Sequence, residues 1–211
     1  MTLTITPTDV LIVVDVQYDF LPGGSLAVVD GDAIIPLINR LAQKFTNVVL
    51  TQDWHPADHI SFASNHPGRA PFEVIDLPYG QQVLWPDHCV WDSEGAELSA
   101  DLAIPHGQLI IRKGYHQSVD SYSGFQEADR HTRTGLTGYL RERGLGRLFV
   151  VGLATDYCVG WTALDGVAAG FDVTVIEDAT GAIDNAGSLA RAWADMAEAG
   201  VKRVMSKDIL G

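Results

Sequence analysis

The stretch of this chain that best predicts its fold reads Arg147-Leu-Phe-Val-Val-Gly-Leu-Ala-Thr-Asp-Tyr-Cys158-Val-Gly-Trp161. An apolar run rich in valine stops at Gly152, and a helical pattern follows from 158 to 169. A buried strand that passes into a helix is the repeating unit of parallel α/β sheets. Cys158 would then lie at a helix N-terminus, where the positive end of the helix dipole favours the thiolate. Cys158 is therefore a candidate nucleophile, although a packed core thiol fits this segment equally well.

The same alternation of strand and helix runs through the rest of the chain. Short apolar runs predict strands at 10–14, 48–52, 108–112, 147–151, 172–176 and 201–205. Helical patterns cover residues 32–45, 131–143, 158–169 and 186–199. This alternation predicts an α/β fold, namely a doubly wound, six-stranded parallel sheet with helices on both faces and right-handed crossovers.

Length and composition are those of a single compact domain. A chain of 211 residues, 46% of them hydrophobic, can bury a sizeable core. We therefore expect one domain over residues 1–211. Residues 53–107 interrupt the alternation, because they are rich in proline and have no strong periodicity. Long irregular segments inside compact domains are usually functional, so part of a site is expected there.

Two further strand ends carry reactive side chains. The run Val10-Leu-Ile-Val-Val14 ends in Asp15, and the run Gln108-Leu-Ile-Ile-Arg112 ends in Lys113. Ligands of such sheets bind just beyond the carboxyl ends of the strands, so these side chains would meet Cys158 there. Asp15 is suited to accept the thiol proton, and a nearby Lys113 would lower the pKa of the cysteine. The alternatives are an Asp15 that caps a turn and a Lys113 that is a solvated strand end.

A third constellation consists of possible metal ligands. Asp53-Trp-His55-Pro-Ala-Asp-His59 directly follows the predicted strand at 48–52, and His88 follows later, in Trp85-Pro-Asp-His88. In an extended segment, the side chains of an Asp-x-His pair point to the same side. One carboxylate with two or three imidazoles suits one divalent metal ion such as zinc, iron or manganese. The alternative for each lone histidine is an ordinary surface or core position.

Six blocks of sequence together resemble one known family, the nicotinamidase/pyrazinamidase branch of the isochorismatase-like cysteine hydrolases. These blocks are Val13-Val-Asp15-Val-Gln-Tyr-Asp-Phe20, Thr51-Gln-Asp53-Trp-His55-Pro-Ala-Asp-His59-Ile-Ser-Phe62, Leu84-Trp85-Pro-Asp-His88-Cys-Val90, Arg112-Lys113-Gly, Asp120-Ser-Tyr122-Ser and Val151-Gly-Leu153-Ala154-Thr-Asp-Tyr-Cys158-Val. They occur in the family's order and run through most of the chain. The Asp, Lys and Cys are shared by the wider superfamily, whereas the metal set with Trp-Pro-x-His is typical of the amidase branch.

The resemblance implies a role for each site residue. It implies a catalytic triad of Asp15, Lys113 and Cys158. It implies an oxyanion hole formed by the backbone amides of Ala154 and Cys158, with a cis peptide bond between Leu153 and Ala154. The implied metal ligands are Asp53, His55 and His88, with His59 as a provisional addition. The implied substrate pocket is lined by Phe20, Leu26, Trp85 and Tyr122.

The resemblance also implies an activity and a strand order. The activity is the metal-dependent hydrolysis of nicotinamide, and also of pyrazinamide, by a cysteine nucleophile, in NAD salvage. Zinc is the metal it favours, with iron or manganese as alternatives. The strand order it implies is 3-2-1-4-5-6 in a single isochorismatase-like hydrolase domain.

Charge and cysteine content limit the partners and the compartment. The net charge of −13 disfavours nucleic acid and anionic membrane as partners. Two cysteines, Cys89 and Cys158, are too few for a disulfide framework, which favours the reducing cytoplasm. No signal peptide or membrane-spanning run is recognisable. The expected partner is the small molecule nicotinamide, and the chain could be a monomer or a homo-oligomer.

Three other functions remain to be weighed. A dinucleotide-binding oxidoreductase would carry Gly-x-Gly-x-x-Gly after its first strand, where this chain reads Asp15-Val-Gln-Tyr-Asp-Phe20. Another cysteine hydrolase of the superfamily, acting on a different small amide or carbamoyl substrate, would not need the metal set. A non-catalytic metal-binding scaffold would not need reactive side chains at three strand ends.

Overall fold

The computed structural model describes residues 3–211 and is built around a six-stranded sheet. Its strands follow the order β5-β2-β1-β6-β7-β8, and all neighbouring pairs are parallel. Their bounds are β1 (Asp9–Val14), β2 (Asn47–Asp53), β5 (Leu109–Lys113), β6 (Arg147–Leu153), β7 (Asp172–Gly181) and β8 (Lys202–Val204). Counted within this sheet alone, the order is 3-2-1-4-5-6, which confirms the prediction.

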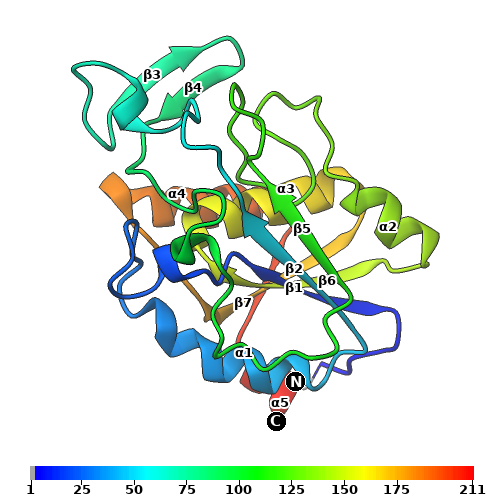
Figure 1. Ribbon diagram of the computed structural model, residues 1–211. Coiled ribbons are helices and arrows are strands. Elements are labelled where there is room, and N and C mark those ends of the chain that lie inside the picture. Colours follow the sequence, from blue (N-terminus) through cyan, green and yellow to red (C-terminus); the bar gives the residue numbers. More distant parts are fainter. Residues whose placement is uncertain (1–2) are drawn as a thin grey trace.

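Helices cover both faces of the sheet (Figure 1). One face carries α1 (Ile35–Ala42) and α5 (Lys207–Leu210), and the other carries α2 (Leu136–Glu142), α3 (Gly160–Ala168) and α4 (Ser188–Glu198). Alternate residues of β1 enter different cores, because successive side chains of a strand point to opposite faces. Leu11 packs with Ile38 in one hydrophobic core, and Ile12 packs with Leu140 in the other. Burial on both faces explains why β1 is apolar from Val10 to Val14.

Two predicted helices begin later in the structure than in the sequence pattern. The segment predicted as helix over 131–143 is helical only in α2, because Gly135 takes a φ of +96° and the Thr134 hydroxyl bonds back to the Gly124 carbonyl. The segment predicted over 32–45 starts with a 3-10 turn at Gly31–Ile34 before α1. Tertiary hydrogen bonds at the first turns, which the periodicity does not contain, account for such shifts.

The segment 53–107, expected to be irregular, contains a β-hairpin. Strands β3 (Val74–Leu77) and β4 (Gly80–Val83) pair antiparallel and stand apart from the main sheet, beyond β5 (Figure 1). Each strand has only four residues; β3 has no fully buried position, and β4 has a single one, Gln82. The prediction was wrong here, because so short a pattern is too weak to separate a strand from a loop.

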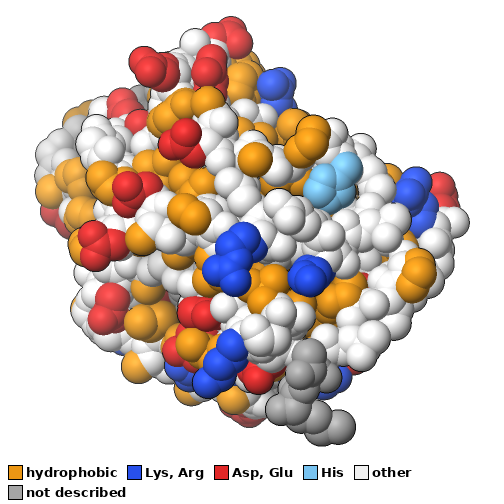
Figure 2. Space-filling model, turned by 90° about the horizontal axis from the view of Figure 1, so that it is seen from below, with side chains coloured by type: hydrophobic (Ala, Val, Ile, Leu, Met, Phe, Trp, Pro, Cys, Tyr) orange, Lys and Arg blue, Asp and Glu red, His pale blue; other side chains and the backbone are white. Residues whose placement is uncertain are grey.

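On the face of the molecule that Figure 2 shows, acidic and basic side chains are interspersed and form no continuous basic surface. Among residues 3–211, no helix combines the length and the apolar character needed to cross a membrane. The candidate site is buried at the carboxyl edge of the sheet.

Candidate active site

Four neighbouring strands bring the predicted reactive residues to one edge of the sheet. In β5 and β2, Lys113 lies directly opposite Asp53. Asp15 follows β1 with a φ of +46°, an uncommon backbone conformation for a residue other than glycine. Cys158 lies in the turn Thr155–Val159 that joins β6 to α3. This turn has π-helical hydrogen bonding, so the thiol lies inside the first turn of the helical segment.

Close approach of β1 and β6 depends on a glycine at the end of β6. Gly152 lies opposite Val14 and has a φ of +113°. A Cβ at this position would overlap the backbone of Val14. Only glycine combines this φ with this contact, so the apolar run of β6 has to end in glycine just before the turn that carries Cys158.

The ammonium group of Lys113 is the centre of the cluster. Its Nζ lies 2.8 Å from Asp15 Oδ2 and 3.4 Å from Cys158 Sγ, and it also pairs with Asp53 Oδ1. A fourth neighbour, the Ser121 carbonyl, is 3.3 Å away. Lys113 and Asp15 are completely buried. The three predicted residues Asp15, Lys113 and Cys158 are thus in one constellation, and Lys113 joins it to Asp53.

A hydroxyl group that the sequence analysis did not single out holds the other oxygen of Asp15. Thr51, two residues before the end of β2, donates a 2.6 Å hydrogen bond from Oγ1 to Asp15 Oδ1. Thr51 is fully buried. One carboxylate oxygen therefore faces Thr51 and the other faces Lys113, which leaves the carboxylate little rotational freedom.

Burial and charge set the protonation states of this constellation. Burial, only partly offset by Lys113, raises the pKa of Asp15. Burial alone would lower the pKa of Lys113, but Asp15 and Asp53 raise it well above its usual value. Burial also raises the pKa of the Cys158 thiol well above its usual value, against the opposing effect of Lys113. The expected lowering of the thiol pKa by Lys113 is present but is outweighed by desolvation and by two carboxylates.

The predicted metal ligands converge beside this cluster. Asp53, His55 and His88 are buried, and one ligand atom of each lies within 4.8 Å of the others. His55 Nε2 is 3.7 Å and His88 Nε2 is 4.0 Å from Asp53 Oδ2. The three donors come from the end of β2 and from the segment 85–91 that runs beside it, where the His55 N–H bonds the Cys89 carbonyl.

Hydrogen bonds orient both imidazoles of this set. His55 Nδ1 donates to the Gly114 carbonyl and His88 Nδ1 donates to the Pro86 carbonyl, both at 2.8 Å. Each ring therefore directs Nε2 towards Asp53, as metal-binding histidines do. Burial and His55 lower the pKa of His88 to about 4, so His88 is neutral at pH 7. A carboxylate and two oriented imidazoles fit a divalent metal ion with positions left open.

His59 lies next to this set without completing it. Its ring stacks 4.3 Å from that of His55, but its Nε2 donates to the Val119 carbonyl at 3.1 Å. Its Nδ1 accepts from the Ser61 hydroxyl at 2.7 Å. Both ring nitrogens are thus engaged in hydrogen bonds. The structure groups His59 with His55 and Asp120, and not with Asp53 and His88.

A small pocket opens over Cys158 and the metal ligands. Its walls include all four residues predicted to line a substrate pocket, Phe20, Leu26, Trp85 and Tyr122. Asp53, His55, His88 and Cys158 line the same space. Ala154 lines it as well, and the peptide bond between Leu153 and Ala154 is cis, as predicted. The pocket therefore joins an aromatic wall, a thiol and a metal-binding set.

Three further residues line this pocket but were not among the predicted site residues: Asp120, Tyr157 and Ile183. Asp120 and Tyr157 stand inside quoted sequence blocks, next to residues that were assigned roles, so proximity in the motif was an available signal. Ile183 comes from the loop after β7 and has no such signal. Its N–H bonds the carboxylate of Asp156, which ties this loop to the turn that carries Cys158.

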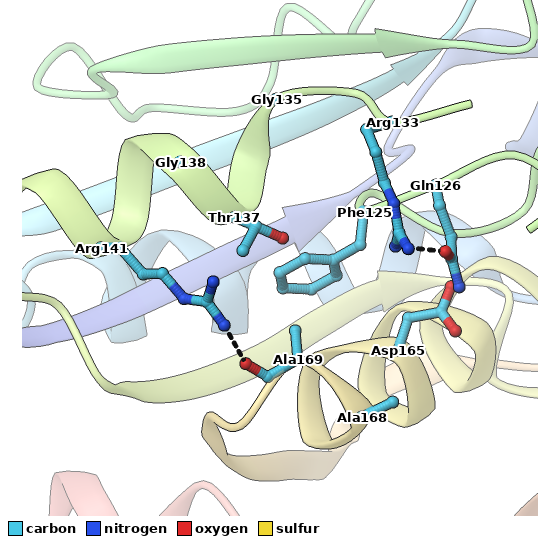
Figure 3. A pocket seen from close by; sticks show the side chains of 10 residues that line it. All are labelled: Phe125, Gln126, Arg133, Gly135, Thr137, Gly138, Arg141, Asp165, Ala168 and Ala169. Atoms are coloured by element: carbon cyan, nitrogen blue, oxygen red, sulfur yellow. Dashed lines mark hydrogen bonds between the residues drawn. The ribbon is translucent and has the colours of Figure 1, made fainter. Parts of the chain in front are cut away.

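A larger cavity lies elsewhere, between α2 and α3 (Figure 3). Its charged side chains form hydrogen bonds or ion pairs within the protein. Arg141 donates to the Ala169 carbonyl at 2.8 Å, Arg133 bonds Gln126, and Asp165 pairs with Arg130 at 2.7 Å. None of the predicted site residues lines it. The smaller pocket over Cys158 is therefore the candidate active site.

Comparison with known proteins identifies the family of this chain. Residues 9–208 match the isochorismatase domain. The chain belongs to the isochorismatase family. A nicotinamidase from Acinetobacter baylyi is 59% identical over 200 residues, which make up 95% of this chain and 94% of that protein.

Two solved structures extend the comparison of this isochorismatase-family chain. The structure of an Acinetobacter baumannii nicotinamidase/pyrazinamidase superposes with a TM-score of 0.95 at 60% identity, covering 96% of this chain and 98% of that one. A pyrazinamidase of Pyrococcus horikoshii in complex with zinc has a TM-score of 0.77 at 37% identity, covering 94% and 99%. The six-stranded α/β isochorismatase fold is therefore shared along nearly the whole chain.

Proposed function

We propose that this isochorismatase-family chain is a nicotinamidase, which hydrolyses nicotinamide to nicotinate and ammonia and also accepts pyrazinamide. One observation carries the proposal: a buried thiol, held beside an ammonium group and its partner carboxylate, lines the same aromatic pocket as a metal-binding set. The similarity to proteins named nicotinamidase over almost the entire chain supports the same substrate. Such an activity belongs to NAD salvage.

In the first half of the reaction Cys158 is the nucleophile and Asp15 the general base. Asp15 takes the thiol proton as Sγ attacks the carboxamide carbon, and its raised pKa suits a group that both accepts and returns a proton. The proton then passes from Asp15 to the amide nitrogen. The C–N bond breaks, ammonia leaves, and a thioester on Cys158 remains.

In the second half a water molecule replaces the cysteine. Asp15 removes a proton from the water as its oxygen attacks the thioester carbon, and it returns this proton to Sγ as the C–S bond breaks. The carboxylic acid that leaves loses its remaining proton to solvent and becomes nicotinate. Lys113, held between Asp15 and Asp53, keeps the carboxylate in place and balances the developing negative charge.

The carbonyl oxygen develops negative charge in both halves. We assign the backbone amides of Ala154 and Cys158 to its stabilisation, because both residues line the pocket at the two ends of one turn. Loss of one such donor typically costs roughly 3–4 kcal/mol of transition-state stabilisation.

The residues that would hold the metal are Asp53, His55 and His88, without His59. The bound divalent cation, which we propose to be zinc, supplies a Lewis-acidic anchor for a lone pair of the substrate. Phe20 and Trp85 would flank the substrate ring, with Leu26 and Tyr122 completing the pocket. Two free cysteines support a cytoplasmic location, and the proposed partner is the small-molecule substrate rather than nucleic acid or membrane.

The experiment that tests this function combines turnover with trapping. Purified protein loaded with zinc should release ammonia from nicotinamide, and Cys158→Ala should lower kcat at least about a thousandfold while the fold is retained. Rapid-quench mass spectrometry should find a nicotinoyl adduct on Cys158. The matched control is Cys89→Ser, which should remain active because Cys89 is buried under the site without lining it.

An adduct on Cys89, or full activity of Cys158→Ala, would contradict the assignment of the nucleophile. Turnover of carbamoyl compounds with none of nicotinamide would instead identify a different hydrolase of the same family.

A further inference from the structure

The hairpin β3–β4 stands apart from the sheet (Figure 1), yet one of its side chains is almost completely buried. Gln82 in β4 is only 1% exposed, whereas its neighbour Gln81 is exposed. A buried amide needs partners for two N–H groups and for its oxygen, so its surroundings indicate what it holds in place.

Gln82 links the hairpin to the wall of the candidate pocket. Its Nε2 donates to Asp120 Oδ2 at 2.6 Å and to the Val83 carbonyl at 2.7 Å, and it lies 3.2 Å from the Tyr122 hydroxyl. Its Oε1 accepts from the Tyr79 hydroxyl at 3.1 Å. The hydrogen bonds of this one side chain thus reach two residues that line the pocket, Asp120 and Tyr122.

The Tyr122 hydroxyl also connects Gln82 to a second ring, that of Trp85. It accepts a 3.0 Å hydrogen bond from Trp85 Nε1 as well as the contact from Gln82. Burial and the charge of Asp120 raise the pKa of Tyr122 well above its usual value, so the hydroxyl keeps its proton. The rings of Tyr122 and Trp85 meet edge to face at 6.4 Å. Gln82 is therefore hydrogen-bonded to the Tyr122 hydroxyl, which in turn accepts the hydrogen bond from the Trp85 ring.

We propose that Gln82 is a positioning residue for the Tyr122 and Trp85 rings, and that the hairpin β3–β4 thereby determines which substrate rings the pocket admits. The inference rests on the proposed function, because it concerns the ring-binding wall of the same site. The selected class is a planar, unsubstituted six-membered heteroaromatic amide. Larger ring-substituted amides are rejected as long as the wall is held in place.

Loss of the Gln82 side-chain amide should affect substrate binding more than the chemical step at Cys158. None of the hydrogen bonds of Gln82 goes to Asp15, Lys113 or Cys158. Removing them leaves buried polar groups of the wall without a partner and lets the two rings shift. The Michaelis constant should rise while the reactivity of the thiol stays the same.

The test compares Gln82→Met and Gln82→Glu with the exposed control Gln81→Met. Methionine keeps the length of the side chain without its hydrogen bonds, and glutamate keeps its shape but replaces the donor with a charge that faces Asp120. We expect both Gln82 variants to raise KM for nicotinamide about tenfold and to change kcat less than threefold. Their preference for nicotinamide over 5-methylnicotinamide should fall about tenfold.

Alkylation of Cys158 by iodoacetamide should stay within twofold of wild type in all three variants, which shows that the triad is intact. Gln81→Met should match the wild type in every measurement. A Gln82→Met variant that is folded, with wild-type KM and wild-type selectivity, would overturn the inference. If Gln82→Met does not fold, unchanged constants in Gln82→Glu would overturn it. Wild-type protein without nicotinamide turnover would contradict the proposed function instead.

Discussion

Lys113 is the residue at which the proposed triad and the proposed metal site meet. Its ammonium contacts Asp15, Cys158 and Asp53, and it is completely buried. A buried cation is stable only when opposite charges compensate for its lost hydration, and two carboxylates do so here. Removing Lys113 would leave both carboxylates close to each other without a cation, so we regard it as essential for site geometry as well as for proton transfer.

Thr51 allows a sharper test at the same scale, because it touches only one triad residue. Thr51→Val removes the 2.6 Å hydrogen bond to Asp15 but preserves the shape of the side chain. We expect kcat to fall about tenfold with KM nearly unchanged, because the general base loses its orientation. Thr51→Ser keeps the hydroxyl and should retain most of the activity. Steady-state kinetics of both variants provide the check, and equal kcat in Thr51→Val and wild type would show that the hydroxyl serves packing alone.

At the scale of elements, the joint between β1 and β6 matters most, since these strands carry Asp15 and the turn with Cys158. At their opposite end Asp9 lies in register with Arg147. The guanidinium donates from Nε to Asp9 Oδ1 at 2.9 Å and also bonds Oδ2. The Thr6 N–H adds a third hydrogen bond to this carboxylate, at 2.6 Å. A pair of this geometry holds the two strands at a fixed separation.

The stability of this joint should depend on pH. Burial alone would raise the pKa of Asp9, but the bonds from Arg147 and Thr6 outweigh it and hold the pKa below the ordinary value of 3.8. The contribution is therefore complete above pH 3.8 and is lost as the pH falls through the lower folded-state value.

Asp9→Asn should lower the free energy of unfolding by about 2 kcal/mol at pH 7. The difference from wild type should shrink as the pH falls below about 3.8. Urea denaturation at neutral and acidic pH measures both quantities. The exposed pair Lys202–Asp172 is the control, and Asp172→Asn should change stability by less than about 1 kcal/mol. A difference for Asp9→Asn that does not depend on pH would contradict the argument.

At the scale of the whole molecule, the sheet brings a metal-binding set next to the thiol of Cys158, although the two are far apart in the sequence. From the sequence, metal loss is predicted to leave Cys158 reactive, because the ligands follow a different strand. The structure predicts otherwise, since Lys113 contacts Asp53 as well as Cys158. Without a metal cation the charge of Asp53 is less compensated, and nearby negative charge raises the pKa of a thiol.

Stripping the metal with a chelator should therefore lower nicotinamide turnover at least about a hundredfold and also slow the alkylation of Cys158 at pH 8. Added zinc should restore both rates, whereas His88→Ala should not respond at micromolar zinc. Turnover that is lost while the alkylation rate stays unchanged would show that the metal acts on the substrate alone.

The arrangement of the pocket predicts selectivity for the ring nitrogen. The metal-binding set and the aromatic wall line the same space, so a ring lone pair can be a point of recognition. A site that contacts a polar group rejects an analogue without it much more strongly than an apolar pocket does. Pyrazinamide should be hydrolysed like nicotinamide, and benzamide should have kcat/KM at least about a hundredfold lower. Picolinamide, whose nitrogen is displaced, should also be poor. Equal kcat/KM for benzamide and nicotinamide would contradict recognition of the nitrogen.

The sequence by itself determined the sheet, because buried parallel strands are apolar on both faces and alternate with helices. All six predicted strands occur, in the predicted order, and the reactive residues lie just beyond or at the carboxyl ends of four of them. Resemblance to the family was needed to name the strand order, the oxyanion turn and the pocket residues, since no periodicity distinguishes them.

Only the tertiary structure decided the features that depend on contacts between distant segments. The sequence contains no signal that Thr51 holds Asp15 or that Gln82 reaches Tyr122 across 40 positions of the chain. It likewise does not show that His59 directs both nitrogens to other partners. The protonation of Cys158 depends on its burial beside two carboxylates. Hydrophobic patterning determines which face of an element is buried, but hydrogen bonds and charge interactions depend on the distances that packing creates.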